Sequence, residues 1–224
     1  MAVGYNPSIV SDGLVFFLDP ASPRCYSGSG NTANGLVGGI GATLVNGVGF
    51  TSSNNGSFVF DGSDDYIAAS GTNFPLGSSP RTLNIWYYTK TSTWQGNSNN
   101  LFWYGTTVGG QSFGVDFDTY PMMEFYSWAN DLNWNTLAPQ EGWKNLQITY
   151  DSNLAIKIYE AGILVTAKTL VLNTVLSSNV QIGAITSLSH YFDSNISQVS
   201  MYNRALSQQE ILQNFNATRF RYGI

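Results

Sequence analysis

Residues 57–67 constrain the fold of this chain more than any other segment. They read Ser-Phe-Val-Phe-Asp-Gly-Ser-Asp-Asp-Tyr-Ile, so apolar and aromatic residues stand on both sides of a short run of Asp, Gly and Ser. Aromatic and β-branched residues fit a half-buried pleated surface, and Asp and Gly supply the hydrogen bonds and the backbone freedom of a tight turn. The segment predicts a β-hairpin. Because a lone hairpin is not stable in water, further strands must cover it.

Further strands are indicated by short apolar runs and by apolar–polar alternation with a period of two. This alternation predicts a half-buried strand over residues 144–151, followed by strands over 155–160 and 163–172 that complete an antiparallel meander. In residues 196–202 the alternation slips, which predicts a bulge near residues 197–198. The other predicted strands are residues 13–20, which we expect to be buried on both faces, and residues 42–45, 81–88, 101–104, 112–117, 122–128 and 180–183.

One helix is clearly signalled, near the C-terminus. Ser207 and Glu210 have the spacing of a capping box, in which each side chain bonds the backbone N–H of the other. Leu206 precedes the cap and can pack against Ile211, so the entry into the helix is fixed as well. The apolar stripe ends near Thr218, and we expect this helix to lie against the edge of the sheets.

Length and composition favour one all-β domain. Of the 224 residues, 43% are hydrophobic and only 10% are charged, and 23 are glycine, which suits a turn-rich β protein. We expect a single domain over residues 1–224, with an N-terminal arm over 1–12 and a C-terminal tail over 219–224. Cys25 is the only cysteine, so no intrachain disulfide can form, and we expect it to be a small buried hydrophobic residue.

The charge pattern argues against a nucleic acid partner, and the hydropathy pattern argues against a membrane span. The formal net charge is -5, and the nine Lys and Arg residues are scattered singly, so there is no basic stripe to neutralise a phosphate backbone. No apolar run reaches about 18 residues, and the N-terminus lacks a basic segment followed by an apolar one. We therefore expect no nucleic acid partner, no membrane span and no signal peptide.

No catalytic set is evident in the sequence. A retaining glucanase needs two carboxylates about 5 Å apart, commonly supplied by a Glu-x-Asp-x-x-Glu strand, and this chain has no such motif. Its four glutamates are isolated from one another in the sequence, and only Asp116 and Asp118 share a strand face. His190, the only histidine, lacks a neighbouring nucleophile and is expected to be bonded locally. We predict that the chain is not an enzyme and has no catalytic residues.

Two groups of aspartates are candidates for a hard cation. Asp61, Asp64 and Asp65 crowd one turn, and Asp116 with Asp118 forms the second group. Carboxylate and carbonyl oxygens are the ligands that Ca²⁺ takes, whereas a zinc site would need further His or Cys residues. Aspartate carboxylates also accept hydrogen bonds from backbone N–H groups of their own turn, which accounts for aspartates at these positions without a metal. No cofactor is required, and Ca²⁺ is the ion to expect if one is bound.

Aromatic and amide residues gather in the middle of the chain, between residues 94 and 134. Sugar rings stack on exposed aromatic faces while amides and carboxylates bond the hydroxyls, so this composition is typical of a glycan site. The alternative is that these rings fill the core or an interface, where Trp and Tyr are also enriched. We expect Trp94 and Trp134 to be the most exposed. The candidate glycan-binding residues are Trp94, Asn97, Trp128, Asn133 and Trp134.

Five segments in this order resemble one known family. Residues 13–19, 57–67, 143–151, 180–183 and 196–212 are similar to the corresponding parts of laminin-G-like, concanavalin-A-like jelly-roll domains. The resemblance covers nearly the whole chain and implies a β-sandwich of two antiparallel sheets with one short C-terminal helix. The family usually has Asn-Gly where this chain has Ala-Gly in the turn before residue 163, which alters only turn chemistry.

A narrower resemblance concerns domains of this kind encoded in tailed bacteriophage structural genes. They open with an Asn-Pro segment like Asn6-Pro7 and end just past the helix. This similarity implies a non-enzymatic virion component that decorates or cements a capsid or forms part of a tail or fibre. Such a protein would be made in the host cytoplasm and would have other virion proteins or copies of itself as partners. We expect the tail residues Arg219, Phe220, Arg221 and Tyr222 to serve assembly. The alternative function is a lectin-like module that binds surface glycans.

Overall fold

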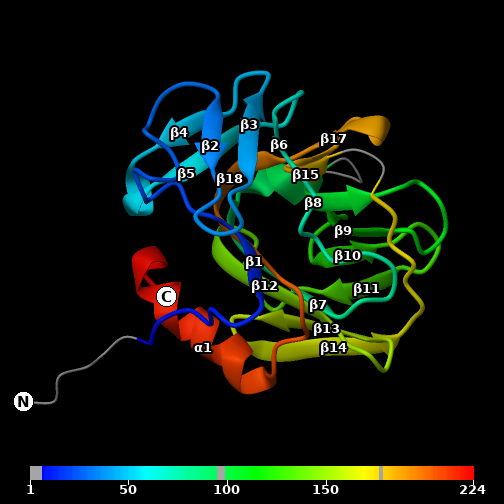
Figure 1. Ribbon diagram of the computed structural model, residues 1–224. Coiled ribbons are helices and arrows are strands. Elements are labelled where there is room, and N and C mark those ends of the chain that lie inside the picture. Colours follow the sequence, from blue (N-terminus) through cyan, green and yellow to red (C-terminus); the bar gives the residue numbers. More distant parts are fainter. Residues whose placement is uncertain (1–6, 95–98, 177–178) are drawn as a thin grey trace, which may run out of the picture.

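The computed structural model describes residues 7–94, 99–176 and 179–224, and it consists of two eight-stranded sheets packed face to face (Figure 1). All of the strand pairings in both sheets are antiparallel, as predicted. The first sheet, called the back sheet here, comprises β14 (Ile163–Thr169), β13 (Ala155–Glu160), β12 (Gly142–Tyr150), β7 (Arg81–Thr89), β18 (Asp193–Tyr202), β5 (Ser57–Asp61) and β4 (Gly49–Thr51) in this order, with β1 (Leu14–Leu18) also paired to β18.

The second sheet, called the front sheet, lies opposite. Its strands are, in order, β11 (Leu132–Asn135), β10 (Met122–Tyr126), β9 (Ser112–Phe117), β8 (Asn99–Gly105), β15 (Val180–Ile182), β6 (Tyr66–Ala69), β3 (Gly41–Val45) and β2 (Thr32–Asn34). A separate short ribbon pairs β16 (Ala184–Ile185) with β17 (His190–Tyr191). The remaining elements are the helix α1 (Gln208–Thr218) and the 3-10 turns η1 (Ser53–Asn55), η2 (Thr91–Trp94), η3 (Thr186–Leu188) and η4 (Arg219–Tyr222).

The core fills the space between the two sheets. Because successive strand residues point to opposite faces, each central strand sends every second side chain inward. Leu146 and Ile148 of the back sheet and Phe113 and Val115 of the front sheet are fully buried and belong to one cluster. Cys25 is 1% exposed and belongs to the same cluster, as predicted. The prediction of an all-β jelly-roll sandwich with one short C-terminal helix is therefore confirmed.

The predicted hairpin over residues 57–67 was wrong. β5 pairs with β18 and β4 in the back sheet, whereas β6 pairs with β15 and β3 in the front sheet, so the turn carries the chain from one sheet to the other. The turn chemistry itself is as expected, since Asp61 accepts a hydrogen bond from the backbone of Ser63 and Gly62 has φ 77°. Alternation shows which side chains are buried, and it does not show in which sheet a strand pairs.

Most other strand predictions are confirmed. β12, β13 and β14 form the predicted meander, and the pairing of β18 with β7 shifts register between Ile196 and Gln198, where the bulge was expected. β1 differs from the prediction because it buries Phe16 and Leu18 while its other side chains are partly exposed. The short elements β2, β4, β11, β16 and β17 were not predicted.

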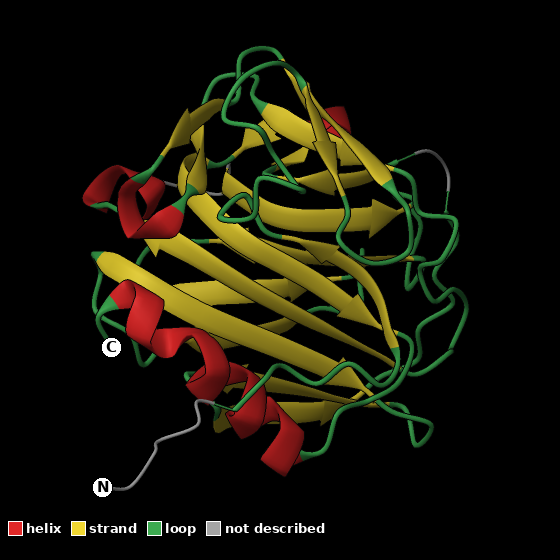
Figure 2. Cartoon of the chain, turned by 60° about the vertical axis from the view of Figure 1, so that its left-hand side comes forward, coloured by secondary structure: helices red, strands yellow, loops and turns green. Residues whose placement is uncertain are grey.

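Helix α1 lies across the outer face of the back sheet rather than along an edge (Figure 2). The predicted capping box is present, with Ser207 accepting from the backbone of Glu210 and the Glu210 side chain accepting from Ser207. Gln147 of β12 donates to the carbonyl of Ile211, and its side chain is fully buried. The outward polar residues of β12 are thus covered rather than half-exposed. None of the helices that the structure describes has the length and hydropathy needed to cross a bilayer.

The C-terminal tail belongs to the same covering layer. The ring of Tyr222 stacks on Trp86 of β7 with 4.0 Å between centroids, and Tyr222 is buried. The guanidinium of Arg221 bonds both carboxylate oxygens of Asp19, at 2.8 and 3.0 Å, and also the carbonyl of Gly56. Of the four residues expected to serve assembly, Arg221 and Tyr222 are therefore engaged within the domain, while Phe220 is 61% exposed.

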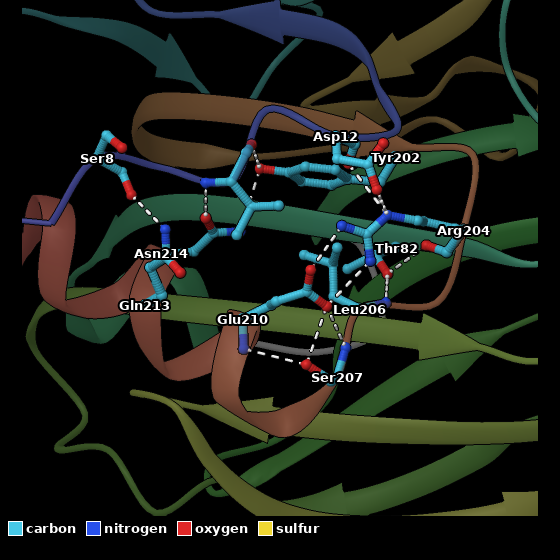
Figure 3. A network of polar contacts seen from close by, with 11 residues as sticks. Ser8, Asp12, Thr82, Tyr202, Arg204, Leu206, Ser207, Glu210, Gln213 and Asn214 are labelled. Carbon is cyan, nitrogen blue, oxygen red and sulfur yellow. Dashed lines mark hydrogen bonds and ion pairs between the residues drawn. The ribbon is translucent and has the colours of Figure 1, made fainter.

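The N-terminal segment closes the other end of this layer (Figure 3). Val10 donates its backbone N–H to the side chain of Asn214 on α1 and accepts from the Tyr202 hydroxyl through its carbonyl. Nearby, Arg204 makes a paired contact with the carboxylate of Glu210, at 2.6 and 3.0 Å. The described part of the arm is thus fixed to the sheet and to the helix at once.

Candidate functional site

The outer face of the front sheet carries a row of polar side chains across four strands. In the register of β8, β9, β10 and β11, Asn100 lies opposite Asp116, Asp116 opposite Glu124, and Glu124 opposite Asn133. Residues that pair across antiparallel strands place their side chains on the same face, about 5 Å apart at Cβ. The neighbouring Phe117 points into the core, so this polar row points outward.

A second row, two residues further along β9 and β10 and beyond the bulge in β8, is aromatic. Trp103 of β8 lies opposite Gly114 of β9, which lies opposite Tyr126 of β10. The rings of Trp103 and Tyr126 are 5.7 Å apart, and Trp128 continues the series at 5.6 Å from Tyr126. A Cβ at Gly114 would come within 2.6 Å of the Trp103 ring, so the indole lies directly over this glycine. Gly114 therefore allows the ring to lie across the sheet.

A cavity borders the aromatic row. It has a volume of about 250 Å³ and lies between β8 and the turn η3. Gln181 of β15 holds that turn in place, because its amide bonds both the backbone N–H and the hydroxyl of Thr186. The lining residues are Trp103, Gly105, Thr106, Thr107, Gln181, Thr186 and Ser187. Trp103 is 5% exposed, while Tyr126 and Trp128 are partly exposed, so the open end of the row is the Tyr126 end.

The ribbon of β16 and β17 covers the other end of the polar row. Nδ1 of His190 lies 3.0 Å from Oδ2 of Asp116, and Oδ1 of Asp116 accepts from the backbone of Phe117. Burial raises the pKa of Asp116, and the hydrogen bond with His190 opposes that shift. The expectation that His190 is bonded locally was wrong, because its partner comes from β9, 74 residues away in the sequence.

The carboxyl group of Glu124 is also perturbed. Its pKa is raised to about 7, first because it is half-buried and then because of the negative charges of Asp131, Asp116 and Asp118. The sequence indicated that the four glutamates are isolated from one another, and it did not reveal that Glu124 has aspartates as neighbours. Its partner Asp116 is eight residues earlier in the chain and becomes a neighbour only through the register of β9 and β10. The strands predicted over residues 112–117 and 122–128 are joined by a short connection, and pairing them as a hairpin could have revealed the pair.

The structure separates the predicted glycan-binding residues. Trp94 and Trp134, expected to be the most exposed, are 3% and 5% exposed. The indole of Trp94 donates to the carbonyl of Gln140, and that of Trp134 donates to the carboxylate of Glu160, so both rings belong to the interior. Trp128 and Asn133 do lie at the outer face of the front sheet. Asn97 lies outside the described residues.

One group of possible metal ligands is present in the described part of the chain. Carboxylate oxygens of Asp61, Asp64 and Asp65 all lie within 4.8 Å of one another, and Asp65 is 3% exposed. Oxygen ligands at this spacing fit Ca²⁺, but the turn also uses them itself, since Asp65 accepts from the backbone of Asp61. Asp116 and Asp118 belong to no such group of three among the described residues. Ca²⁺ binding at Asp61, Asp64 and Asp65 stays a prediction.

A larger polar cavity adjoins these aspartates. Its volume is about 560 Å³, and it is lined by Asp61, Gly62, Ser63, Ser92, Asn99, Ser189, Tyr191 and Asp193. Asp193 is already paired with Lys90 at 2.7 Å and with the Ser92 hydroxyl. Tyr191 is the only aromatic residue of this lining, so it offers no row of rings comparable to that of the front sheet.

Comparison with solved structures places the fold among known carbohydrate-active and receptor-binding proteins. The sialidase of Trypanosoma rangeli superposes with a TM-score of 0.72 at 15% identity, covering 95% of this chain and 34% of the sialidase. The binding domain of botulinum neurotoxin serotype G gives 0.72 at 15% identity, covering 90% of this chain and 50% of that one. At these identities the likeness concerns the fold alone, and the chain spans about a third to a half of these relatives.

One comparison spans both partners almost completely. Domain 4 of AbnA, an extracellular arabinanase from Geobacillus stearothermophilus solved in complex with arabinotriose, has a TM-score of 0.66 at 15% identity, with 90% of this chain and 97% of that domain covered. No curated protein sequence matches this chain significantly. A family model matches residues 61–212, which is more than half of the chain. The chain therefore belongs to the concanavalin A-like lectin/glucanases superfamily, in its laminin-G-like form.

Proposed function

We propose that this chain is a carbohydrate-binding domain and that the outer face of the front sheet holds the glycan. The observation that carries the proposal is the pair of parallel rows on that face, one aromatic and one of hydrogen-bonding side chains. On β9 and β10 the two rows lie two residues apart, about 7 Å along the strand, so one sugar ring can contact both rows.

The two rows would act on different parts of a sugar. The apolar C–H face of a pyranose or furanose ring stacks on an aromatic plane, and Tyr126 and Trp128 present partly exposed rings for this contact. The hydroxyl groups at the ring edge would then donate to the acceptors of the polar row, of which Glu124 and Asn133 are accessible. The rigid strands fix both rows before any ligand arrives, which limits the entropic cost of binding.

The comparisons support this proposal over the virion hypothesis. The arabinanase domain with the same fold was solved with an arabinose oligosaccharide, and the toxin domains of this fold are described as binding domains. The prediction that the chain is not an enzyme stays a prediction. It is supported by the state of Asp116, which is 5% exposed and already bonded to His190 and to the backbone of Phe117, so it is poorly placed to attack a glycosidic carbon.

A glycan array followed by titration calorimetry tests the proposal. The array identifies a ligand, and calorimetry then compares the wild type with Tyr126→Ala and Trp128→Ala. Loss of one stacking ring should lower the affinity about tenfold or more. Tyr88→Ala is the matched control, because Tyr88 is a partly exposed strand tyrosine on the outer face of the back sheet. An array without any bound glycan, or equal losses in the control, would contradict the proposal.

A structural role in a virion is the second candidate. It is favoured by an apolar surface around a cavity of about 260 Å³ near the C-terminus, where Leu137, Ile163 and Ile224 are 65%, 60% and 46% exposed. Exposed apolar patches of this kind are typical of protein interfaces. Under this hypothesis a second copy of the chain covers the patch, and the protein is found in virions. Sedimentation of the wild type and of Ile163→Ser tests it, since a monomer at all concentrations argues against such an interface.

A further inference from the structure

The proposed glycan site is strongly acidic. Asp116 and Glu124 lie in its polar row, Asp118 follows at the end of β9, and Asp131 lies in the loop between β10 and β11. Asp131 is held there because its carboxylate accepts from the backbone of Ser127 at 2.7 Å and from that of Ala129. Burial raises the pKa of Glu124 most, and the negative charges of Asp131, Asp116 and Asp118 raise it further. We call these four residues the acidic group.

The basic residues are placed elsewhere. All nine Lys and Arg side chains lie in the described part of the chain, and only Lys168 contacts the acidic group, through the backbone carbonyl of Asp131. Arg81 is enclosed in the core by Tyr104 and Thr174, and Arg204 and Arg221 are ion-paired on the back-sheet side. The other basic side chain beside the acidic group is the imidazole of His190, which is already bonded to Asp116.

In the described part of the chain, one buried hydrogen-bond acceptor of the polar row is unused. The side chain of Asn100, fully buried in the polar row beside Asp116, uses its amide N–H on the carbonyl of Val115 and leaves its oxygen without a partner among the described residues. Glu124 and Tyr126 stand two residues apart on the same strand face, so a carboxylate adjoins an aromatic ring. A carboxylate beside an aromatic face is the combination that recognises an ammonium group, by charge and by cation–π attraction.

We infer that the glycan site selects its ligand by charge and takes oligosaccharides that carry free amino groups, in preference to N-acetylated or neutral ones and to the exclusion of acidic sugars. The inference rests on the proposed function and specifies its substrate class. The ammonium of an amino sugar would lie between Glu124 and Tyr126, while the ring stacks on Tyr126 and Trp128. A sugar carboxylate at the same place would meet the four carboxyl groups of the acidic group and only one neighbouring lysine.

The test compares three hexasaccharides by calorimetry at one pH and one ionic strength. They are a β-1,4-linked glucosamine oligomer, its fully N-acetylated counterpart and an oligogalacturonate. The glucosamine oligomer should bind at least tenfold more tightly than the N-acetylated one, and the oligogalacturonate should not bind. Equal affinity for the first two, or binding of the acidic sugar, overturns the inference and leaves the proposed function standing. If none of the three binds while the array detects another glycan, the inference alone fails. If the array is empty as well, both fail.

Two Glu→Gln variants separate a local effect from the net charge of the protein. Glu124→Gln removes the charge beside Tyr126 and should reduce the preference for the amino form from tenfold to about twofold or less. Glu141→Gln changes the net charge equally, but Glu141 is exposed and bonded to Thr91 beside the back sheet, so the preference should not change. An equal loss in both variants would show attraction by overall charge and would overturn the inference. A thermal melt of each variant verifies that it is folded.

Discussion

The two outer faces of the sandwich both carry amide and aromatic side chains, but a helix covers those of the back sheet, whereas part of the front-sheet set is exposed. On the back sheet, Asn145 and Gln147 of β12 point outward, yet they are 3% and 0% exposed, because helix α1 covers them. Gln147 donates to Asn145 and to the helix backbone, and Asn145 donates to Asn84, so these polar groups bond one another. Each face has a buried acceptor without a partner among the described residues, Oε1 of Gln147 and Oδ1 of Asn100. The front sheet differs because its polar row also carries the partly exposed Glu124 and the exposed Asn133.

This difference distinguishes polar side chains that stabilise the fold from polar side chains that are available to bind a ligand. A polar side chain that is buried and bonded to its neighbours stabilises the fold to the extent that those bonds compensate its desolvation. A polar side chain beside an exposed ring that keeps unused hydrogen-bond acceptors can form further hydrogen bonds only with a ligand or with water. The aromatic residues show the same contrast, since Trp86 is enclosed by Phe215 and Tyr222 while the row from Trp103 opens toward Trp128.

The largest expected effect is on the covered face. Tyr222→Ala removes the ring that stacks on Trp86 and leaves a cavity under the tail, so the free energy of unfolding should fall by about 3–5 kcal/mol. In a domain of this size that corresponds to a melting temperature lower by roughly 10 °C. Phe220→Ala is the control, because Phe220 is 61% exposed and its removal should cost less than about 0.5 kcal/mol. Calorimetric melts measure both variants.

This expectation reverses the one drawn from the sequence for the tail. A tail that served only assembly could be removed without loss of stability, whereas a tail that is packed on Trp86 and bonded to Asp19 cannot. Equal stability of Tyr222→Ala and Phe220→Ala would show that the tail is not part of the covering layer.

An intermediate effect is expected at the aromatic row. Gly114→Ala places a methyl group within 2.6 Å of the Trp103 ring, so the indole must move. Overpacking of this kind should cost about 1–3 kcal/mol of stability. It should also weaken glycan binding about tenfold, since the ring no longer lies across the sheet. Retained affinity together with lower stability would mean that Trp103 supports the site without shaping it.

The smallest expected effect is a pH dependence of the open face. The pKa of Glu124 is about 7 in the folded protein against 4.5 ordinarily, so the folded state binds this proton more tightly than the unfolded chain does. Stability from this group is therefore present at low pH and is lost as the pH rises from about 4.5 to about 7. Glu124→Gln should melt like the wild type near pH 4.5 and about 2 °C higher at pH 8. The same difference at both pH values would contradict this assignment.

Most strands and the helix could be predicted from the sequence, whereas strand pairing, the position of the helix and the burial of single side chains could not. The capping box at Ser207 and the slip in register near Gln198 depend on local spacing, and both are present. Whether a strand pairs in one sheet or the other depends on distant segments, so residues 57–67 were taken for a hairpin. The position of α1 and the exposure of Trp94 failed for the same reason, because burial depends on what packs against a residue.

The candidate site shows the same limit. Trp128 and Asn133 were proposed from composition and do lie at the outer face of the front sheet. Asp116 and Glu124 become a pair only through strand register, and His190 reaches Asp116 only because the ribbon of β16 and β17 folds over the sheet. A single sequence holds no signal for such contacts beyond the hairpin that joins β9 to β10.

The most direct test of this account is a map of backbone amide shifts by NMR, with and without the tightest glycan found on the array. If the glycan binds the front sheet, we expect the changes in amide chemical shift to concentrate on the outer residues of β8, β9 and β10, including Gly114 and Tyr126, and on the turn η3. We expect no change around Trp86 and Gln147. Shifts centred on the covered back sheet, or confined to the cavity beside Asp61 and Asp193, would contradict the assignment of the glycan site to the front sheet.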